Sequence, residues 1–333
     1  MIVLAIETSC DDTSVAVVSE EYNVLSSIVS SQNDIHSIFG GVVPEVASRA
    51  HLEKISQVFH LALKEARISL DDISAIAVTI GPGLVGSLLV GISFAKGLSL
   101  ILNKPILAVN HIEGHFFAPF LEHKDLTYPF LALVASGGHT GLYLVKEFRD
   151  YELIGQTRDD AAGEAFDKVA KLLGLGYPGG VAIERFVGDF DGDIIFPKPL
   201  EKEKDFSFSG LKTAVLNIVK KNRDLTEELK RNISSSFQKT VVEILTEKTV
   251  SEALKRGIKN IVISGGVSAN KLLRKNFQAL ADKSNLKIYI PSPKYCTDNA
   301  GMIGAVGLNL LSKGIFAPET ISAIADWDVS DLL

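Results

Sequence analysis

Two histidines four residues apart are the chemically most suggestive feature of the sequence. They occur in the segment NHIEGH as His111 and His115. If this segment is helical, the two imidazoles lie one turn apart on the same face and can bind one metal ion. A helix that merely carries two histidines is the alternative, because short motifs also arise by chance. The pair therefore predicts a metal site that needs a third ligand from elsewhere.

The position of Glu113 argues against a zinc peptidase. In peptidase helices the general-base glutamate directly follows the first histidine, or directly precedes the second in the inverted form. Glu113 instead lies two residues from each histidine. At about 100° per residue it points roughly 200° away from both, toward the opposite face of the helix. A peptidase is therefore the least favoured of the functions considered.

Asp298 is the candidate for the third ligand. It lies in the segment YCTDNAGM at residues 295–302, where a helix is expected to begin, so a helix N-cap is its alternative role. Two histidines and a carboxylate leave positions open for an oxygen-bearing substrate, a donor set associated with iron(II) among other metals. Cys296 is expected to pack rather than to bind metal.

Two glycine-rich turns could hold a phosphate. The segment SGG occurs at residues 136–138 and again at 264–266, each time after a β-rich run. Backbone N–H groups of such turns, and the positive end of the helix expected from Ala269, can bind an anion. Each turn alone is weak evidence, since glycines are common in plain turns. Together they favour a nucleotide cleft, and Asn270 either reaches the nucleotide or caps the helix.

Three acidic residues lie where they could act on a ligand. Asp11 falls in the first polar turn and is the candidate for a polar catalytic role, with stabilisation of its own turn as the alternative. Asp167 and Glu184 flank the YPGG turn at residues 177–180 and could accept hydrogen bonds from ligand hydroxyls or an amine. Solvated acids on helices are the competing interpretation of this second pair.

The segment FSFSGLKT at residues 206–213 alternates aromatic residues with serines and lies in a basic region. Residues 198–275 contain 17 Lys and Arg against 9 Asp and Glu, although the whole chain has a net charge of -6. The aromatic residues could stack on bases, and a basic face could tolerate a polyanion. The alternatives are an edge strand that enters a helix, and ordinary solvated helix faces.

The elements that must position these residues show a repeated plan. Strands are expected at residues 3–6 and 15–18 around a polar turn, and again at 130–134 and 142–145 around SGGHT. A strand, a glycine turn and a helix follow in each half, over 73–102 and 261–281. The repetition predicts an α/β protein with two duplicated lobes around a nucleotide cleft, as in the actin, sugar kinase and heat-shock chaperone superfamily.

The expected lobes follow from this plan and from the length of 333 residues, which exceeds the usual size of a single core. The first lobe comprises residues 1–127, with 299–315 folding back onto it, and the second comprises 128–298. Residues 316–333 are expected to form a tail that docks on the body or a partner, with simple fraying as the alternative.

Composition and terminal sequence exclude several classes of protein. Hydrophobic residues make up 46% and charged residues 22% of the chain, as in globular proteins. The apolar stretch at 73–102 is interrupted by GPG and by Lys96, which favours a strand, a turn and a buried helix over a membrane span. No signal peptide pattern is visible, so a cytoplasmic location is expected. Two cysteines are too few for a disulfide framework or a zinc ribbon.

Seven motifs, in order along nearly the whole chain, resemble one family. They are IETSCDDT at 6–13, NHIEGH at 110–115, SGGHT at 136–140, GEAFDK at 163–168, YPGG at 177–180, FSFSGLKT at 206–213 and SGGVSAN at 264–270. The set is similar to that of the TsaD family, formerly called Gcp, in its bacterial branch. These proteins are tRNA N6-adenosine threonylcarbamoyltransferases, once described as O-sialoglycoprotein endopeptidases. One departure is Val181, where the family commonly has proline.

The resemblance implies an activity, cofactor and partners. It implies transfer of a threonylcarbamoyl group from threonylcarbamoyl-AMP to N6 of adenosine 37 in tRNAs that read codons starting with A. It also implies one divalent metal ion, Fe²⁺ before Zn²⁺ or Mg²⁺, a catalytically silent TsaB-like paralogue, a TsaE-like ATPase and an upstream synthase. The residues carried over are His111, His115 and Asp298 for the metal, and Val134, Ala135, Ser136, Gly137, Gly138, Asp167, Gly180, Glu184 and Asn270 for the adenylate. Because exocyclic N6 is a poor nucleophile, our own hypothesis is that Asp11 helps to position or deprotonate it.

Two further functions stay open from the residues alone. An ATP-hydrolysing or kinase-like enzyme of the same fold would consume ATP without other proteins. A nucleotide-switched chaperone or scaffold would need no transfer chemistry and would tolerate loss of His111 and His115.

Overall fold

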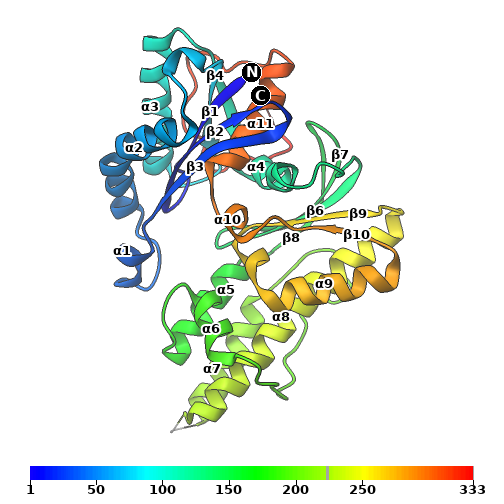
Figure 1. Cartoon of the computed structure of the whole chain (residues 1–333). Helices are drawn as coiled ribbons and strands as arrows, with labels where there is room; N and C mark the ends of the chain where they lie inside the picture. The colour runs from blue at the N-terminus through cyan, green and yellow to red at the C-terminus, as the bar shows by residue number, and fades with distance from the viewer. Residues whose placement is uncertain (223–224, 333) are drawn as a thin grey trace. The chain divides into compact units, whose positions relative to one another are not determined.

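The computed structural model describes residues 1–222 and 225–332. The chain divides into two compact units, the first comprising Met1–Leu126 and Pro291–Leu333, and the second comprising Thr127–Ile290 (Figure 1). Each unit is built around one β-sheet, and each is described by itself.

The sheet of unit 1 has the strand order β3-β2-β1-β4-β5. Its first three strands are antiparallel, whereas β4 and β5 run parallel to β1. The central segments of β1 and β4 are apolar and buried, as expected for a sheet that is covered on both faces. The strands are β1 (Ile2–Glu7), β2 (Asp12–Ser19), β3 (Asn23–Ser31), β4 (Ala75–Gly81) and β5 (Ile106–Asn110).

The sheet of unit 2 repeats this plan with the order β10-β9-β6-β7-β8. Here β6, β7 and β8 are antiparallel, and β9 and β10 run parallel to β6. The duplicated α/β topology predicted from the sequence is therefore confirmed. The strands are β6 (Phe130–Ala135), β7 (Thr140–Glu147), β8 (Asp150–Gln156), β9 (Asn260–Ser264) and β10 (Lys287–Tyr289).

Helices cover both faces of the unit 1 sheet. The long helices α2 (Pro44–Ala66) and α3 (Val85–Leu102) pack on the face that carries Leu4 and Ile6. The helix α11 (Ala300–Ser312) packs on the other face, where a Cβ on Gly304 would lie 2.4 Å from Val18. The short helices α1 (Asn33–Ser37), α4 (His111–Phe117) and α10 (Pro293–Cys296) complete the unit.

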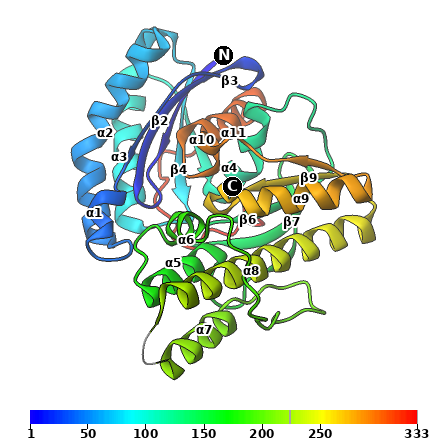
Figure 2. The same cartoon turned by 60° about the horizontal axis from the view of Figure 1, so that its bottom comes forward.

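The core of unit 2 lies between its sheet and its helices, and includes the buried rings of Phe166, Phe237 and Phe277. The helices α8 and α9 lie side by side (Figure 2). The helices of the unit are α5 (Ala162–Leu173), α6 (Gly179–Val187), α7 (Ser209–Lys221), α8 (Glu227–Arg256) and α9 (Lys271–Ser284).

The chain returns to unit 1 earlier than the sequence suggested. Residues 291–298 were expected in the second lobe, but unit 2 ends at Ile290. The carboxylate of Glu122 accepts hydrogen bonds from the backbone N–H and the hydroxyl of Ser292, both at 2.6 Å, which attaches this segment to unit 1. Asp298 therefore belongs to the same unit as the two histidines.

The C-terminal segment is part of the unit 1 core as far as the structure describes it. Its backbone hydrogen-bonds to β4, where Ile324 N donates to Ile80 O at 2.8 Å. The side chains of Ile321 and Trp327 are each only 5% exposed and join the apolar cluster beneath α2 and α3. Residues 316–332 therefore dock on the body of unit 1 and do not fray. Leu333 lies outside the described residues.

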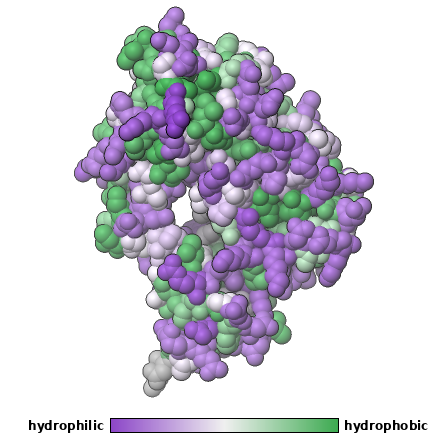
Figure 3. Space-filling model, in the orientation of Figure 1, coloured by the Kyte–Doolittle hydropathy of each residue, from purple (hydrophilic) through white to green (hydrophobic). Residues whose placement is uncertain are grey.

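The helix α3 differs from the buried helix that we expected. Among the described residues it is the one helix long and apolar enough to cross a membrane, and only 28% of it is buried. Leu100 and Ile101 are 85% and 79% exposed. Figure 3 shows apolar atoms among hydrophilic ones in the upper part of the view, where Figure 1 draws α2 and α3. This helix thus has one face in the core and one apolar face without cover in unit 1.

Replacement of Gly81 by alanine is predicted to disturb the contact between β4 and the C-terminal segment. A Cβ at Gly81 would lie 2.0 Å from Ile324 O, so the backbone must move. We expect Gly81→Ala to lower the free energy of unfolding by about 1–3 kcal/mol or more, measured by urea denaturation. The control is Gly97→Ala in α3, where a Cβ meets nothing within 4 Å, and roughly 0.5–1 kcal/mol of stabilisation is expected. Unchanged stability of Gly81→Ala would contradict this account.

Candidate functional site

The helix that carries the two histidines starts directly at the carboxyl end of β5. Asn110 is its N-cap, and its Oδ1 accepts hydrogen bonds from the N–H groups of Ile112 at 2.9 Å and Glu113 at 3.3 Å. The Nδ2 of Asn110 donates to the carbonyl of Trp327 at 3.0 Å. The start of α4 is therefore fixed by its own strand and by the C-terminal segment.

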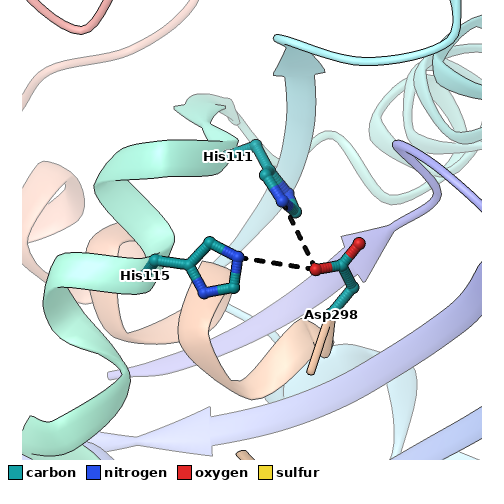
Figure 4. A group of neighbouring side chains, drawn as sticks. All are labelled: His111, His115 and Asp298. Carbon is teal, nitrogen blue, oxygen red and sulfur yellow. Dashed lines mark ion pairs between the residues drawn. The ribbon is translucent and has the colours of Figure 1, made fainter. Parts of the chain in front are cut away.

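His111, His115 and Asp298 converge in unit 1 (Figure 4). The Nε2 atoms of His111 and His115 lie 3.4 and 3.5 Å from the same carboxylate oxygen, Oδ1 of Asp298. One ligand atom from each residue lies within 4.8 Å of the others. The two imidazoles are buried, and the side chain of Asp298 is 20% exposed. The structure thus brings together the three residues that the sequence proposed as a metal set.

Three observations favour metal binding over a purely structural role. Asn299, not Asp298, caps α11, because its Oδ1 accepts from Met302 N at 3.0 Å. Among the described residues, the buried Nδ1 of His115 has no hydrogen-bond partner and its buried Nε2 has only Asp298, at 3.5 Å, which is costly unless another ligand completes the site. Ligand atoms about 3.4 Å apart are also the spacing of two tetrahedral donors roughly 2.1 Å from one ion.

The charges of the three residues suit a cation. Burial opposes ionisation of Asp298, but His111 and then His115 hold its pKa below the ordinary value of an aspartate. Burial lowers the pKa of His115, which leaves this imidazole neutral and able to donate a lone pair. Burial acts the same way on His111, but Asp298 and Glu7 outweigh it and raise its pKa. Metal binding at His111 therefore displaces a proton.

Glu113 and Cys296 do not belong to the metal set. Glu113 is fully buried in α4, but among the described residues the group of close ligand atoms contains only the two histidines and Asp298. Cys296 is buried, and its thiol donates to the carbonyls of Pro291 at 3.3 Å and Ser292 at 3.4 Å. Its expected role in packing agrees with these contacts.

The polar turn after β1 is held by a buried histidine of α2. The ring nitrogens of His51 lie 2.8 Å from Thr13 Oγ1 and 2.9 Å from the carbonyl oxygen of Cys10. Asp11 and Asp12 lie between these two contacts. Burial, and then the charge of Asp298, raise the pKa of Asp11. Burial, with the charges of Asp11 and Asp298, raises that of Asp12 to about 7.

The two glycine turns of unit 2 meet at the carboxyl ends of β6 and β9. Val134 is in register with Ser264, and a Cβ on Gly265 would lie 2.4 Å from the carbonyl oxygen of Ala135. The N–H of Gly163, at the start of α5, donates to the carbonyl of Ser136 at 3.0 Å. Ligands of open α/β sheets bind outside such strand ends.

Several of the expected adenylate residues leave room for a ligand at this edge. A Cβ built on Gly137, Gly138 or Gly180 meets nothing within 4 Å, so the backbone of these turns faces open space. Backbone N–H groups in open turns can approach an anion closely.

The acids and the amide of the same edge already make contacts within the protein. Asp167 Oδ1 accepts from Gly179 N at 2.6 Å, and Glu184 Oε2 accepts from Lys271 N at 3.1 Å. Asn270 caps α9, which begins at Lys271 rather than at Ala269, and also donates to Gln238 at 2.9 Å. The cap interpretation of Asn270 is therefore correct, and a role toward the ligand stays a prediction.

The aromatic residues of the segment 206–213 do not stack on bases in this structure. Phe206 and Phe208 are fully buried in the core of unit 2. The carboxylate of Asp159 accepts hydrogen bonds from the hydroxyls of Ser207 and Ser209, at 2.5 and 2.7 Å, which holds the alternate residues on the side of Asp159. The alternation therefore reflects two sides of an extended segment that enters α7.

Ion pairs neutralise part of the basic segment. Lys198 pairs with Glu243 and Glu247, each at 2.9 Å. Arg256 pairs with Glu152 at 2.9 Å. Glu243 and Glu247 are already counted among the acids of residues 198–275, whereas Glu152 lies outside the segment and offsets part of its net positive charge.

Sequence reasoning missed the polar residues behind the site. Glu7 was not among the predicted site residues, although its carboxylate lies 3.1 Å from His111 Nδ1. A carboxylate at the buried end of a central strand was the available signal, because such a position is normally apolar. Nothing in the spacing of His51, Thr79 or Gln238 distinguished them.

Asp12→Asn is predicted to change how stability depends on pH. A carboxyl whose pKa rises to about 7 on folding makes the folded state less stable as pH increases from about 4 to 7. The asparagine variant lacks this loss, so in metal-free protein at pH 8 we expect it to be more stable by about 1–3 kcal/mol. Asp72→Asn is the opposite control, since hydrogen bonds from Ser69 lower the pKa of Asp72 and stabilise its turn. Parallel curves of melting temperature against pH for Asp12→Asn and the unmodified protein would refute the prediction.

Solved structures show what this fold is similar to. A full-length HypF in a phosphate- and nucleotide-bound form has a TM-score of 0.63 at 15% identity, covering 95% of this chain and 56% of that one. A ROK-family glucokinase from Streptomyces griseus has a TM-score of 0.52 at 10% identity, covering 92% of this chain and 99% of the other. These likenesses concern the fold alone, and they confirm the predicted superfamily architecture.

Sequence comparisons show the family. The family model "TsaD: tRNA N6-adenosine threonylcarbamoyltransferase" matches residues 23–305. Proteins named tRNA N6-adenosine threonylcarbamoyltransferase from Caldicellulosiruptor bescii and Thermosipho africanus are 52% and 53% identical, over 97% of this chain and 97% and 98% of theirs. Because the match extends over most of the chain and nearly the full length of these relatives, the protein belongs to the TsaD family.

Proposed function

We propose that this protein transfers a threonylcarbamoyl group from threonylcarbamoyl-AMP to N6 of adenosine 37 in tRNAs that read codons starting with A, with release of AMP. The observation that carries the proposal is the family match over residues 23–305, with relatives of that name about half identical along nearly the whole chain. A cytoplasmic location follows from the proposed tRNA substrate.

The proposed donor needs no covalent enzyme intermediate. Its carbonyl carbon is joined to the AMP phosphate as a mixed anhydride, which is already activated. The N6 nitrogen forms a bond to this carbon, the bond to the phosphate oxygen breaks, and AMP leaves with the electron pair. N6 must also lose a proton. The proposal therefore does not depend on a nucleophilic serine or cysteine.

Asp11 is our candidate for the group that positions N6 or accepts its proton. It lies in the turn between β1 and β2, and burial together with Asp298 raises the pKa of its carboxyl. A carboxylate with a raised pKa is a better base than an exposed aspartate near neutral pH. His51 holds the neighbouring residues Cys10 and Thr13 and so limits the movement of this turn.

His111, His115 and Asp298 are proposed to hold one divalent cation, with Fe²⁺ favoured over Zn²⁺ or Mg²⁺ by the donor set. The chemistry that such a cation supplies when bound is orientation of the donor and stabilisation of negative charge on its oxygens. The neutral imidazole of His115 and the ionised carboxylate of Asp298 support this assignment, and His111 must lose a proton to join them.

The carboxyl edge of β6 and β9 is proposed to bind the adenylate. Open turns at Gly137, Gly138 and Gly180 offer backbone N–H groups to the phosphate. Asp167 and Glu184 lie beside these turns, and Glu184 is our candidate for the ribose contact. Val181 stands where the family commonly has proline. Its side chain is 57% exposed in the first turn of α6, so this departure disturbs no buried contact.

The exposed apolar face of α3 supports the proposed TsaB-like partner. It includes Leu89, Leu100 and Ile101, which are all exposed. Exposed apolar surface of this kind is typical of a protein interface. We propose that the paralogue binds here, while the place of a TsaE-like ATPase has no such support.

The activity is tested by supplying threonylcarbamoyl-AMP and unmodified tRNA, with and without the partner proteins, and measuring the modified nucleoside by mass spectrometry. We expect product, an equimolar amount of AMP, and at least a 100-fold loss of rate in His115→Ala. Asp11→Asn is expected to lower the rate with unchanged tRNA binding. Near-normal turnover of Asp11→Asn would remove that role, and ATP consumption without partners would favour a kinase-like enzyme instead.

The partner surface is tested with Leu100→Asp and Ile101→Asp. A charge on either side chain is expected to weaken binding of the TsaB-like paralogue at least tenfold in titration calorimetry, because it must be desolvated at the interface. Ile195→Asp is the matched control, since Ile195 is 94% exposed in unit 2. Equal binding by the α3 variants and by the control would place the partner elsewhere.

A further inference from the structure

A second buried carboxylate lies behind the proposed metal set. Glu7 is the last residue of β1 and is fully buried. Its Oε1 accepts a hydrogen bond from Ser9 N at 2.5 Å, and its Oε2 accepts one from Thr79 Oγ1 at 2.7 Å. Oε2 also lies 3.1 Å from Nδ1 of His111. The carboxylate thus connects β1, β4 and α4 at one point.

These contacts determine which nitrogen of His111 carries a proton. A neutral imidazole has one N–H donor and one lone pair. An ionised carboxylate can only accept, so the proton belongs on Nδ1, where Glu7 receives it. The Ser9 hydroxyl, 3.1 Å from the same nitrogen, can then serve only as a further acceptor. Nε2 is left with its lone pair, and it is the atom that lies 3.4 Å from Asp298 Oδ1.

The ionised state of Glu7 is supported by its surroundings. Both of its oxygens accept hydrogen bonds, Oε1 from Ser9 N and Oε2 from Thr79 Oγ1, as expected for a carboxylate that can only accept. An ionised group in an apolar interior costs several kcal/mol unless it is paired and hydrogen-bonded. A buried residue that served only to fill space between β1 and β4 would be apolar.

The charge of the surroundings also matches a divalent cation. Glu7 and Asp298 contribute two negative charges, and two neutral imidazoles contribute none. A divalent ion at Nε2 of both histidines would neutralise this charge fully.

We propose that Glu7 is a positioning residue for the metal set: it fixes His111 with the proton on Nδ1 and the Nε2 lone pair directed to the ion. Ligating histidines commonly donate their second nitrogen to a carboxylate, and loss of that partner typically weakens metal binding 10–100-fold. The inference rests on the metal site of the proposed function, but not on the identity of the group that is transferred.

The test is metal affinity, measured by titration calorimetry with Co²⁺ on the full chain without tRNA or donor. Glu7→Gln keeps the shape of the side chain and removes the charge, and we expect its affinity for Co²⁺ to fall 10–100-fold. Ser9→Ala is the matched control, because it removes the other neighbour of Nδ1 without changing the charge, and a change below threefold is expected. Melting temperatures of the metal-free proteins show that each variant is folded.

A second readout separates positioning from a purely structural role. In ¹⁵N spectra of the Zn²⁺-loaded protein, His111 is expected to carry its proton on Nδ1, and Glu7→Gln is expected to show a mixture of states. A structural role would lower the melting temperature and leave both the affinity and the spectrum unchanged. Such a result, in a folded Glu7→Gln variant, would overturn the proposal.

If Glu7→Gln does not fold, the variant Thr79→Val tests the positioning role instead. It removes the hydroxyl that holds Oε2 of Glu7 and leaves the carboxylate in place. We expect about a threefold to tenfold weaker affinity for Co²⁺, because the carboxylate is less well fixed. Unchanged affinity in Thr79→Val would refute the positioning role. Because no transfer is measured, failure of the proposed activity and failure of this inference are distinguishable.

Discussion

The arrangement of unit 1 depends on one electrostatic constraint: the carboxylate of Asp298 lies against two buried imidazoles. Taking these groups out of water is costly, and the cost is met only when the partners are held in place. Asn110 holds the start of α4, Asn299 caps α11 and leaves Asp298 free, and the C-terminal segment hydrogen-bonds to Asn110. Elements from both ends of the chain are therefore needed to place three side chains.

The parts of the fold that were predictable from the sequence are those with a local signal. Apolar strands around polar turns gave the duplicated topology, because alternating hairpins and glycine turns recur at matching places. The histidine pair was recognisable because two residues four positions apart lie on the same face of a helix. Asp298 was recognisable only as an acid near a helix start, where a cap was an equal possibility, and the adjacent Asn299 resolved it.

The remaining parts needed tertiary information. Phe206 and Phe208 have the alternation of a base-stacking surface, but the sequence does not say which side of an extended segment faces the core. Trp327 packs beneath α2 and α3 although more than 300 residues separate it from the β1 residues of the same cluster, and no local pattern reports such a contact. Glu7 shows the same limitation, since its partners Thr79 and His111 come from β4 and α4.

The acids of unit 1 oppose one another's ionisation, and this repulsion is informative about function. Asp298 raises the pKa of both Asp11 and Asp12, and Asp12 reaches about 7. A sequence selected for stability alone would not gather carboxylates that oppose each other's ionisation, whereas functional sites commonly carry such local conflict. A divalent cation between His111, His115 and Asp298 would reduce that repulsion. The same cation would make Asp11 more acidic, so the base and the metal set must be balanced against each other. The lone pairs of the histidines, the charge of Glu7 and the pKa of Asp11 are therefore parts of one electrostatic unit, and a substitution at any of them is expected to alter the others.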